Sequence, residues 1–272
     1  MKTAIIALGD AHINSTVALC PPKVNLDDGG TYHASRAQRW LLDGFQDFTA
    51  WAKDMTEGYR RTVDLNGDLG ELDTKRRSNQ LITPNKATII GMVIDTISPL
   101  MDIADSLFVK RGTPAHTGKS GWLEEAIGKD LDAVQSAKDV YSHWHLRLLA
   151  DKTRIDSAHH ASMPSLPWTE KNAANKIAAV AAWRYAIDME QPLPHLMFRS
   201  HNHRWSDSFD NYPVRAICLP CWSLLTEFGY RIGAENGVAD IGGAVVLCDG
   251  DKYEVHKFRH KPQKGRVWKI QA

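Results

Sequence analysis

Five times along this sequence of 272 residues, a short apolar stretch ends and an aspartate or a histidine follows it. The first such stretch covers residues 2–8 and continues into Gly9, Asp10, Ala11 and His12. Residues two apart in an extended segment point to the same side, so Asp10 and His12 are placed to bind one cation together. Because open α/β sheets carry their ligand sites beyond the carboxyl ends of strands, this stretch predicts a buried strand that delivers chelating side chains.

The other four strand ends also supply an acid or an imidazole. They carry Asp68 after residues 61–66, His116 after residues 106–110, His159 and His160 after residues 154–158, and His201 and His203 after residues 195–198. One histidine near a strand end is more often structural than functional, but five such ends in a row are hard to obtain by chance. Imidazole and carboxylate ligands without paired thiolates favour Mn²⁺, Fe or Zn²⁺ over a structural zinc site. A set this large has room for two metal ions.

Helical periodicity separates these strands. Apolar residues at three- and four-residue steps predict a helix over residues 34–59. Further helices are expected over residues 85–104, with a break at Pro99, and over residues 121–131 and 168–189. Strand, helix and strand in succession, with an acid after each strand, predict a βαβ unit and an α/β fold.

Hairpins and loops complete the expected fold. Residues 143–148 and 154–158 are expected to form one hairpin, with His143 and His145 on its exposed face, and residues 244–248 and 252–258 a second. Residues 13–33 are expected to be loop, because glycine, proline, asparagine and aspartate recur in them. The basic residues between His260 and Lys269 are expected to be solvated surface.

The composition excludes several classes of protein. An apolar share of 43% supports a substantial core, and a net charge of +1 gives no global field for nucleic acid. The initial apolar run is too short for a signal peptide and no stretch reaches membrane-spanning length, so we expect a cytoplasmic protein without a membrane partner. Four cysteines in a chain of this length do not indicate a disulfide scaffold. Cys218 and Cys221 have no second pair, so buried thiols are expected there.

The order and placement of these motifs resemble the calcineurin-like metallophosphoesterases. The signature of that family is Asp-x-His, Gly-Asp-x-x-Asp/Glu, Gly-Asn-His-Asp/Glu, a lone His, and Gly-His-x-His. The corresponding segments here are residues 9–12, 67–71, 112–116, 159–160 and 200–203, which span most of the chain. The resemblance implies an α/β fold, a metallophosphoesterase-type sandwich of two mixed β-sheets flanked by α-helices. One domain over residues 1–272 is expected.

The resemblance also implies a dinuclear metal centre with six protein ligands. They are Asp10, His12 and His203 for one ion, His159 and His201 for the other, and Asp68 as the bridge between the ions. His160 is the alternative to His159, because the sequence does not show which of the two faces inward. The implied cofactors are two divalent metal ions, with Mn expected and Fe or Zn as alternatives.

The third motif departs from the family pattern. Thr113 occupies the position of the metal-binding asparagine, and the next histidine, His116, lies three residues further on. A neutral hydroxyl is a poor ligand, so the second metal ion is left with an open coordination position, to be filled by water, by His116 or by substrate. In the remaining alternative, Thr113 only shapes the turn. His116 is the candidate catalytic residue, either as an acid near the leaving group or as a replacement ligand. Ser200 in place of glycine in the fifth motif is a milder change.

By this resemblance the chain is a phosphoesterase that cleaves a phosphomonoester or phosphodiester with a metal-activated water. Arg199 and Arg204 flank the last motif and are candidates for binding substrate phosphate, with salt-bridged surface as the alternative. Glu71 and Asp73 are candidates for orienting the ligating imidazoles, and surface exposure is the alternative for both. The implied partner is a phosphate-ester substrate, with nucleotides and nucleic acids among the classes considered. Two rival functions are a nuclease of the same superfamily and a metal-binding, non-catalytic scaffold. The sequence leaves the oligomeric state open.

Overall fold

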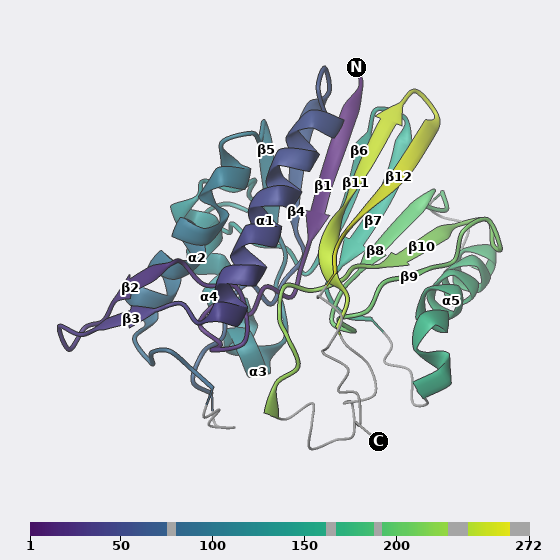
Figure 1. Ribbon diagram of the computed structural model, residues 1–272. Coiled ribbons are helices and arrows are strands. Elements are labelled where there is room, and N and C mark those ends of the chain that lie inside the picture. Colours follow the sequence, from purple (N-terminus) through teal and green to yellow (C-terminus); the bar gives the residue numbers. More distant parts are fainter. Residues whose placement is uncertain (75–79, 162–166, 188–191, 228–238, 262–272) are drawn as a thin grey trace, which may run out of the picture.

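The computed structural model describes residues 1–74, 80–161, 167–187, 192–227 and 239–261, and two five-stranded mixed sheets pack face to face within them (Figure 1). Helices cover the outer faces of both sheets (Figure 1). The predicted fold class, a sandwich of two mixed β-sheets flanked by α-helices, is therefore confirmed. No described helix is both long and apolar enough to cross a membrane.

The first sheet contains three parallel strands and a C-terminal hairpin. Its order is β12-β11-β1-β4-β5, with β1 at Thr3–Leu8, β4 at Arg60–Leu65, β5 at Ser106–Val109, β11 at Ile241–Asp249 and β12 at Lys252–His260. Strands β1, β4 and β5 are parallel, whereas β11 runs antiparallel to both β1 and β12. The carboxyl ends of β1, β4 and β5 therefore meet at one edge of the sheet.

The second sheet also brings three parallel strands together. Its order is β6-β7-β8-β10-β9, with β6 at His145–Ala150, β7 at Thr153–Ala158, β8 at Leu196–Arg199, β9 at Ser206–Asp207 and β10 at Arg215–Cys218. Strands β7, β8 and β10 are parallel, and β6 and β9 pair antiparallel at the two sides. The loops after β7 and β8 consequently leave the sheet in the same direction.

The helices lie between these strands in the chain. They are α1 (Arg36–Met55), α2 (Lys86–Met101), α3 (Pro114–Thr117), α4 (Trp122–Asp130) and α5 (Ala173–Ile187), with 3₁₀ turns η1 (Lys119–Gly121) and η2 (Pro167–Asn172). Helix α1 begins with a capping box in which Ser35 and Gln38 satisfy each other's backbone N–H groups. Helix α5 packs on β9 and β10 of the second sheet.

An apolar layer between the two sheets holds the sandwich together. Ile5 of β1 and Phe198 of β8 belong to the layer between the sheets, and burial of each such side chain stabilises the fold by about 1.5–3 kcal/mol. A buried ion pair also joins strands there, because Lys110 binds Asp64 and the Ser157 hydroxyl donates to the other Asp64 oxygen at 2.8 Å. The sheets are therefore fixed relative to each other close to the edge where the predicted ligands lie.

The predicted break at Pro99 was wrong, because Pro99 lies inside α2. Proline cannot donate to the carbonyl four residues earlier. In this helix the Ser98 hydroxyl donates to that carbonyl, Asp95 O, at 3.2 Å. The Asp95 oxygen thus keeps a partner and the helix continues to Met101.

Several short elements differ from the sequence predictions. The segment expected to be loop contains a small hairpin, β2 (Lys23–Asn25) with β3 (Thr31–His33), and neither β9 nor β10 was predicted. His143 precedes β6 and is only 9% exposed, because its Nε2 hydrogen-bonds to Val134 O at 2.9 Å. Its predicted place on an exposed strand face was wrong.

The predictions for the two C-terminal helical and basic segments also need revision. Helix α5 begins at Ala173, later than the predicted helix, and residues 188–191 lie outside the described residues. His260 ends β12 and packs against Trp40 with ring centroids 4.1 Å apart, so it is not solvated surface. The basic positions beyond Lys261 lie outside the described residues.

Candidate metal centre

The loops that follow β1, β4, β7 and β8 are held together by their main chains. The Asp10 N–H donates to Gly67 O at 3.0 Å, which joins the first two loops. The Ser200 N–H donates to His159 O at 2.8 Å, which joins the last two. The His201 N–H then donates to Asp10 Oδ2 at 2.9 Å and connects the two sheets. The strand ends of both sheets therefore form one site.

Five of the predicted ligands have a left-handed backbone. Their φ angles are 53° for Asp10, 46° for His12, 50° for Asp68, 72° for His201 and 54° for His203. Such a conformation is uncommon outside glycine and costs of order 1–3 kcal/mol per residue. Strain of this kind collects at functional sites, and here it lies at ligand positions in the short loops after β1, β4 and β8.

We call Asp10, His12 and His203 the first cluster, and their ligand atoms lie within 4.8 Å of one another. The Nε2 atoms of His12 and His203 are 3.1 Å apart, and His203 Nε2 is 3.4 Å from Asp10 Oδ1. Two nitrogen ligands, each about 2.1 Å from a metal ion, lie about 3–3.5 Å apart when their bonds meet at ordinary angles. The spacing of the first cluster thus fits a shared cation.

Glu71 orients two imidazoles beside the first cluster. Its Oε2 is 2.9 Å from His12 Nδ1, and both of its oxygens are 2.8 Å from His116 Nδ1. The ring centroids of His12 and His116 are 4.7 Å apart. Because a carboxylate that binds Nδ1 leaves Nε2 for a ligand, Glu71 holds His12 in the tautomer that metal binding requires. The structure therefore places His116, the predicted catalytic residue, next to the first cluster.

The hydrogen bonds between Glu71 and the two imidazoles shift the pKa values of the acid and of His116. Burial acts to raise the pKa of Glu71, but hydrogen bonds from His116 and His12 lower it below the usual value. Burial also acts to lower the pKa of His116, and the hydrogen bond and charge of Glu71 raise it above the usual value. Glu71 is therefore ionised and His116 holds its proton more firmly than a free histidine.

We call Asp68, His159 and His201 the second cluster, whose ligand atoms also lie within 4.8 Å of one another. His159 Nε2 is 3.0 Å from Asp68 Oδ2, and its Nδ1 donates to Asn66 O at 2.7 Å. His159 is buried, whereas His160 is exposed with its ring centroid 5.0 Å away. Of the two adjacent histidines, the structure brings His159 to the other predicted ligands.

The divergent third motif contributes Thr113 to the second cluster. Thr113 Oγ1 lies 3.3 Å from His159 Nε2 and 3.2 Å from His201 Nδ1, and the Thr113 N–H donates to Asp68 Oδ1 at 2.6 Å. Gly112 permits this approach, because a Cβ at that position would overlap the Asp68 main chain and carboxylate. Thr113 rather than His116 thus reaches the second cluster, and a ligand role for its hydroxyl remains a prediction.

Two buried carboxylate oxygens favour the binding of a cation at this site. His159 Nε2 forms an ion pair with Asp68 Oδ2 at 3.0 Å, but neither Asp68 Oδ2 nor Asp10 Oδ1, both buried, accepts a well-oriented hydrogen bond among the described residues. A buried charged group without such partners is costly, and a bound cation removes this cost. Asp10 Oδ1 lies 3.4 Å from His203 Nε2 and 3.9 Å from His159 Nε2, between the two clusters. The donor set therefore fits two cations, while the bridging role of Asp68 remains a prediction.

The pKa values of the two imidazoles in the second cluster shift in opposite directions. Burial acts to lower the pKa of His159, but the charges of Asp68 and Asp10 outweigh it and raise the pKa to about 9. Burial and the neighbouring charge of His159 lower the pKa of His201 to about 4. Without a cation, the protein therefore keeps a proton on His159 to balance its buried carboxylates.

The two predicted substrate-binding arginines differ in their surroundings, and their substrate role remains a prediction. The Arg199 guanidinium donates to Asp156 Oδ1 at 2.8 Å and lines a cavity on the outer face of the second sheet. Arg204 is half-buried in the loop after β8. Asp73, the second candidate for orienting an imidazole, is exposed.

Two site features were not found from the sequence. The partner of His159 is the carbonyl of Asn66, and a main-chain oxygen leaves no mark in a sequence. Asp156 binds Arg199 from the middle of β7, where no motif distinguishes it. All four cysteines are buried free thiols, as expected from their spacing.

No family model and no curated protein matches this sequence. Similar solved structures include a dimetal phosphatase from Danio rerio, with 8% identity, a TM-score of 0.47, and coverage of 94% of this chain and 96% of that chain. They also include Vps29 from Chaetomium thermophilum, with 10% identity, a TM-score of 0.46, and coverage of 95% and 96%. A predicted phosphoesterase from Streptococcus pneumoniae has 11% identity, a TM-score of 0.38, and coverage of 95% and 90%.

These solved structures have the calcineurin-like metallophosphoesterase fold, the family that the sequence motifs resemble. At such identities and TM-scores, no activity transfers from those proteins to this chain.

Proposed function

We propose that this chain, as one domain over residues 1–272, is a dinuclear metal-dependent phosphoesterase that hydrolyses a phosphomonoester or a phosphodiester. One observation supports it most strongly: two adjacent clusters of imidazoles each include a buried carboxylate oxygen, Asp10 Oδ1 or Asp68 Oδ2, that accepts no well-oriented hydrogen bond among the described residues. Imidazole and carboxylate donors in this mixture suit Mn²⁺, with Fe and Zn²⁺ as alternatives.

The first cluster would hold one ion, and the second cluster the other. Two bound cations supply Lewis-acid stabilisation of a phosphoryl oxygen and a water of lowered pKa. Glu71 keeps His12 Nε2 directed at the first cluster through its 2.9 Å contact with His12 Nδ1. In the second cluster, the main-chain N–H of Thr113 fixes the Asp68 carboxylate by donating to its Oδ1 at 2.6 Å.

His116 is the proton donor of this proposal. Its Nδ1 is engaged by Glu71, which leaves Nε2 for the leaving-group oxygen of a substrate. The His116 side chain is 33% exposed, so a substrate can reach it from solvent. A proton delivered from His116 Nε2 would neutralise the leaving-group oxygen as the phosphorus–oxygen bond breaks.

Hydrolysis of bis-p-nitrophenyl phosphate with added Mn²⁺ tests the proposal. The Asp68→Asn variant should lose at least about 100-fold in kcat/KM. Loss of a residue that only orients a metal ligand costs about 10–100-fold, and Asp68 is proposed as a ligand itself. Asp73→Asn, the same change at an exposed position, should leave the rate unchanged. Equal rates for wild type and Asp68→Asn would contradict the proposal.

Thr113 favours one alternative, a metal-binding but non-catalytic scaffold. Its neutral hydroxyl stands between His159 and His201, where a stronger ligand would complete the second cluster. Elemental analysis beside the assay separates the two functions. Bound metal without turnover, whichever divalent cation is supplied, would indicate the scaffold. Single- and double-stranded DNA in the same assay would reveal the nuclease of the same superfamily.

A further inference from the structure

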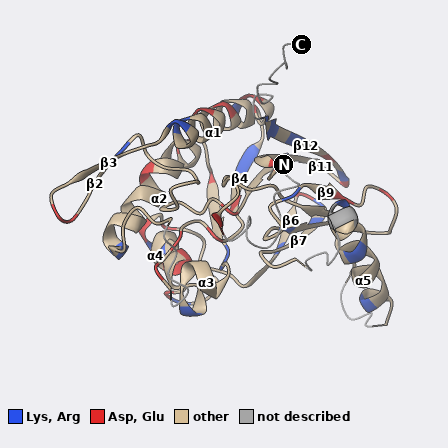
Figure 2. Cartoon of the chain, turned by 60° about the horizontal axis from the view of Figure 1, so that its bottom comes forward, with Lys and Arg blue, Asp and Glu red and all other residues tan. Residues whose placement is uncertain are grey.

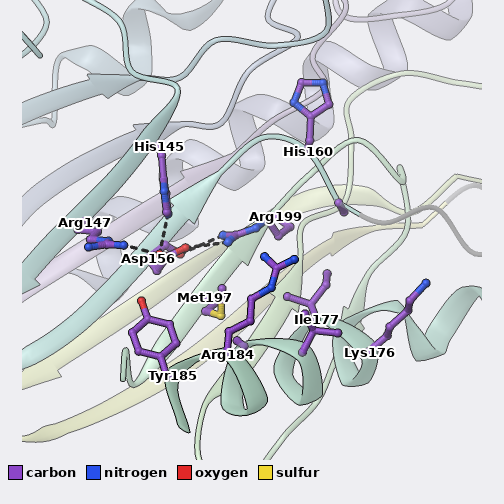
Figure 3. A pocket seen from close by; sticks show the side chains of 13 residues that line it. His145, Arg147, Asp156, His160, Lys176, Ile177, Arg184, Tyr185, Met197 and Arg199 are labelled. Atoms are coloured by element: carbon purple, nitrogen blue, oxygen red, sulfur yellow. Dashed lines mark hydrogen bonds and ion pairs between the residues drawn. The ribbon is translucent and has the colours of Figure 1, made fainter. Parts of the chain in front are cut away.

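A cavity of about 630 Å³ lies on the outer face of the second sheet, beneath α5. Its walls come from β6, β7 and β8 on one side and from α5 on the other (Figure 3). At one end it includes His160, whose ring centroid is 5.0 Å from that of His159 and 5.4 Å from that of His201. The cavity therefore begins beside the second cluster and extends away from it.

The lining of this cavity carries an excess of positive charge. Its charged residues are one carboxylate, Asp156, and four cations, Arg147, Lys176, Arg184 and Arg199. Basic positions recur along α5, as the blue segments of Figure 2 show. Neither a catalytic role at the clusters nor the packing of the second sheet requires so many cations at one place.

Asp156 is already occupied by residues of the sheet. Arg199 donates to its Oδ1 at 2.8 Å, and His145 Nε2 lies 2.6 Å from its Oδ2. Arg147 Nε is 3.9 Å from the same Oδ2 (Figure 3). Burial acts to raise the pKa of Asp156, but the hydrogen bond from His145 and the charge of Arg199 lower it. The Asp156 carboxylate is thus paired with cations of the second sheet, and Arg184 and Lys176 of α5 line the same cavity.

Helix α5 directs its own cations at the cavity. Arg184 and Lys176 are exposed, and Arg184 rises from the helix toward Arg199 in Figure 3. The guanidinium groups of Arg184 and Arg199 line the same cavity, and their mutual repulsion falls when an anion binds between them. Apolar side chains of Ile177 and Met197 form part of the same wall and suit the carbon skeleton of a ligand.

We propose that this cavity is a subsite for a second phosphate group of the substrate. The substrate class is then a phosphate ester with two phosphates on one organic skeleton, the scissile one at the metal clusters and the other among Arg184, Lys176 and Arg199. Guanidinium groups bind phosphate in bidentate geometry, which gives selectivity for a phosphate over an uncharged group. The inference rests on the proposed function for its substrate role but not for the binding itself.

Binding of inorganic pyrophosphate to the metal-free protein tests the subsite without catalysis. Calorimetry in the presence of a chelator should show binding that Arg184→Glu weakens at least about tenfold, because a cation becomes an anion in the cavity. Lys176→Glu should weaken it in the same direction, and it serves as a second variant if one of the two fails to fold. Lys129→Glu on α4, an exposed lysine away from the cavity, is the matched control and should bind as wild type does.

Two chromogenic substrates test the substrate role in the Mn²⁺-loaded protein. They are thymidine 5′-(p-nitrophenyl phosphate) and its 3′-phosphorylated counterpart, which share the scissile bond and differ in the second phosphate. Wild type should prefer the second by at least about tenfold in kcat/KM, and Arg184→Glu should remove the preference. Pyrophosphate binding without turnover would contradict the proposed function and leave the subsite standing. Absent or variant-insensitive pyrophosphate binding, or turnover without preference, would overturn the subsite.

Discussion

The two ligand clusters use different parts of the chain to hold their imidazoles. In the first cluster a side chain does so, because Glu71 binds the Nδ1 atom of His12 and also that of His116. In the second cluster the main chain does so, through Asn66 O on His159. A main-chain N–H holds the carboxylate in both clusters, from His201 to Asp10 and from Thr113 to Asp68. The first cluster is therefore sensitive to one carboxylate, and the second to the path of the backbone.

Because of this difference, the two clusters must be tested with different kinds of substitution. A carboxylate can be replaced by its amide without moving the chain, so Glu71 can be tested by chemistry alone. The backbone near Asp68 can be changed only by altering which residues fit there. Gly112 is the position where this is most restrictive, since a Cβ would overlap Asp68. A change to the backbone should therefore disturb its cluster more than a change to one carboxylate or one hydroxyl.

Gly112→Ala should have the largest effect, at least about 100-fold on phosphoesterase activity, because Asp68 must shift away from the second cluster. Elemental analysis should show the loss of one of two metal ions. Gly91→Ala in α2 is the matched control, since a Cβ at Gly91 would meet nothing within 4 Å beyond its own helix and alanine favours a helix. Full activity and two ions in Gly112→Ala would mean that the main chain does not hold the second cluster.

Glu71→Gln should reduce activity and metal affinity by about 10–100-fold, the usual effect of losing a partner of a metal ligand. Metal titration should show weaker binding at the first cluster only. The control is Glu57→Gln, an exposed glutamate beyond the end of α1. If the second ion is the one lost, then the division between a side-chain cluster and a main-chain cluster is incorrect.

Thr113→Ala should lower the affinity for the second ion by less than about tenfold. The hydroxyl between His159 and His201 is removed, but the N–H that holds Asp68 is retained. Thr113→Ser keeps the hydroxyl and should titrate as wild type does. A loss as large as that of Gly112→Ala would show that the hydroxyl is itself a necessary ligand.

Glu124→Gln should raise the melting temperature of the metal-free protein by about 2–4 °C at pH 8 and by less at pH 5.5. Burial raises the pKa of Glu124 to about 8, and the charge of Asp68 contributes in the same direction. Between the ordinary pKa of a glutamate and about 8, the folded state keeps a proton that the unfolded state loses, so stability falls as pH rises. Thermal unfolding at both pH values, with Glu57→Gln as control, measures the gain. A gain independent of pH would contradict this origin.

The sandwich and the strand-end motifs could be predicted because they are local patterns. An apolar run followed by glycine and a polar residue needs no distant information, and β1, β4, β5, β7 and β8 were all expected near their observed positions. The short strands β9 and β10 could not be predicted in this way. Ser206 and Asp207 form a strand only because Cys218 and Ile217 of β10 lie opposite them.

The choice of His159 over His160 depended on a contact between the loops that follow β4 and β7, which belong to different sheets. Gly67, with φ of 76°, leaves room for His159, because a Cβ at Gly67 would lie 2.6 Å from His159 Nδ1. The position of Thr113 depended likewise on the close approach of Gly112 to Asp68. These choices follow from distances between segments far apart in the chain, which one-dimensional spacing does not contain.

The sequence by itself determined which chemical groups this protein carries and in what order, since Asp10, His12, Asp68, His159, His201 and His203 each lie just beyond a strand. Only the tertiary structure decided that His159 rather than His160 lies among the ligands, and that Arg199 turns to Asp156 on the outer face instead of toward them. The physical reason is that strand periodicity sets the identity of a strand end locally. Its neighbours are set by the register of parallel strands and by the space that a glycine leaves between two loops.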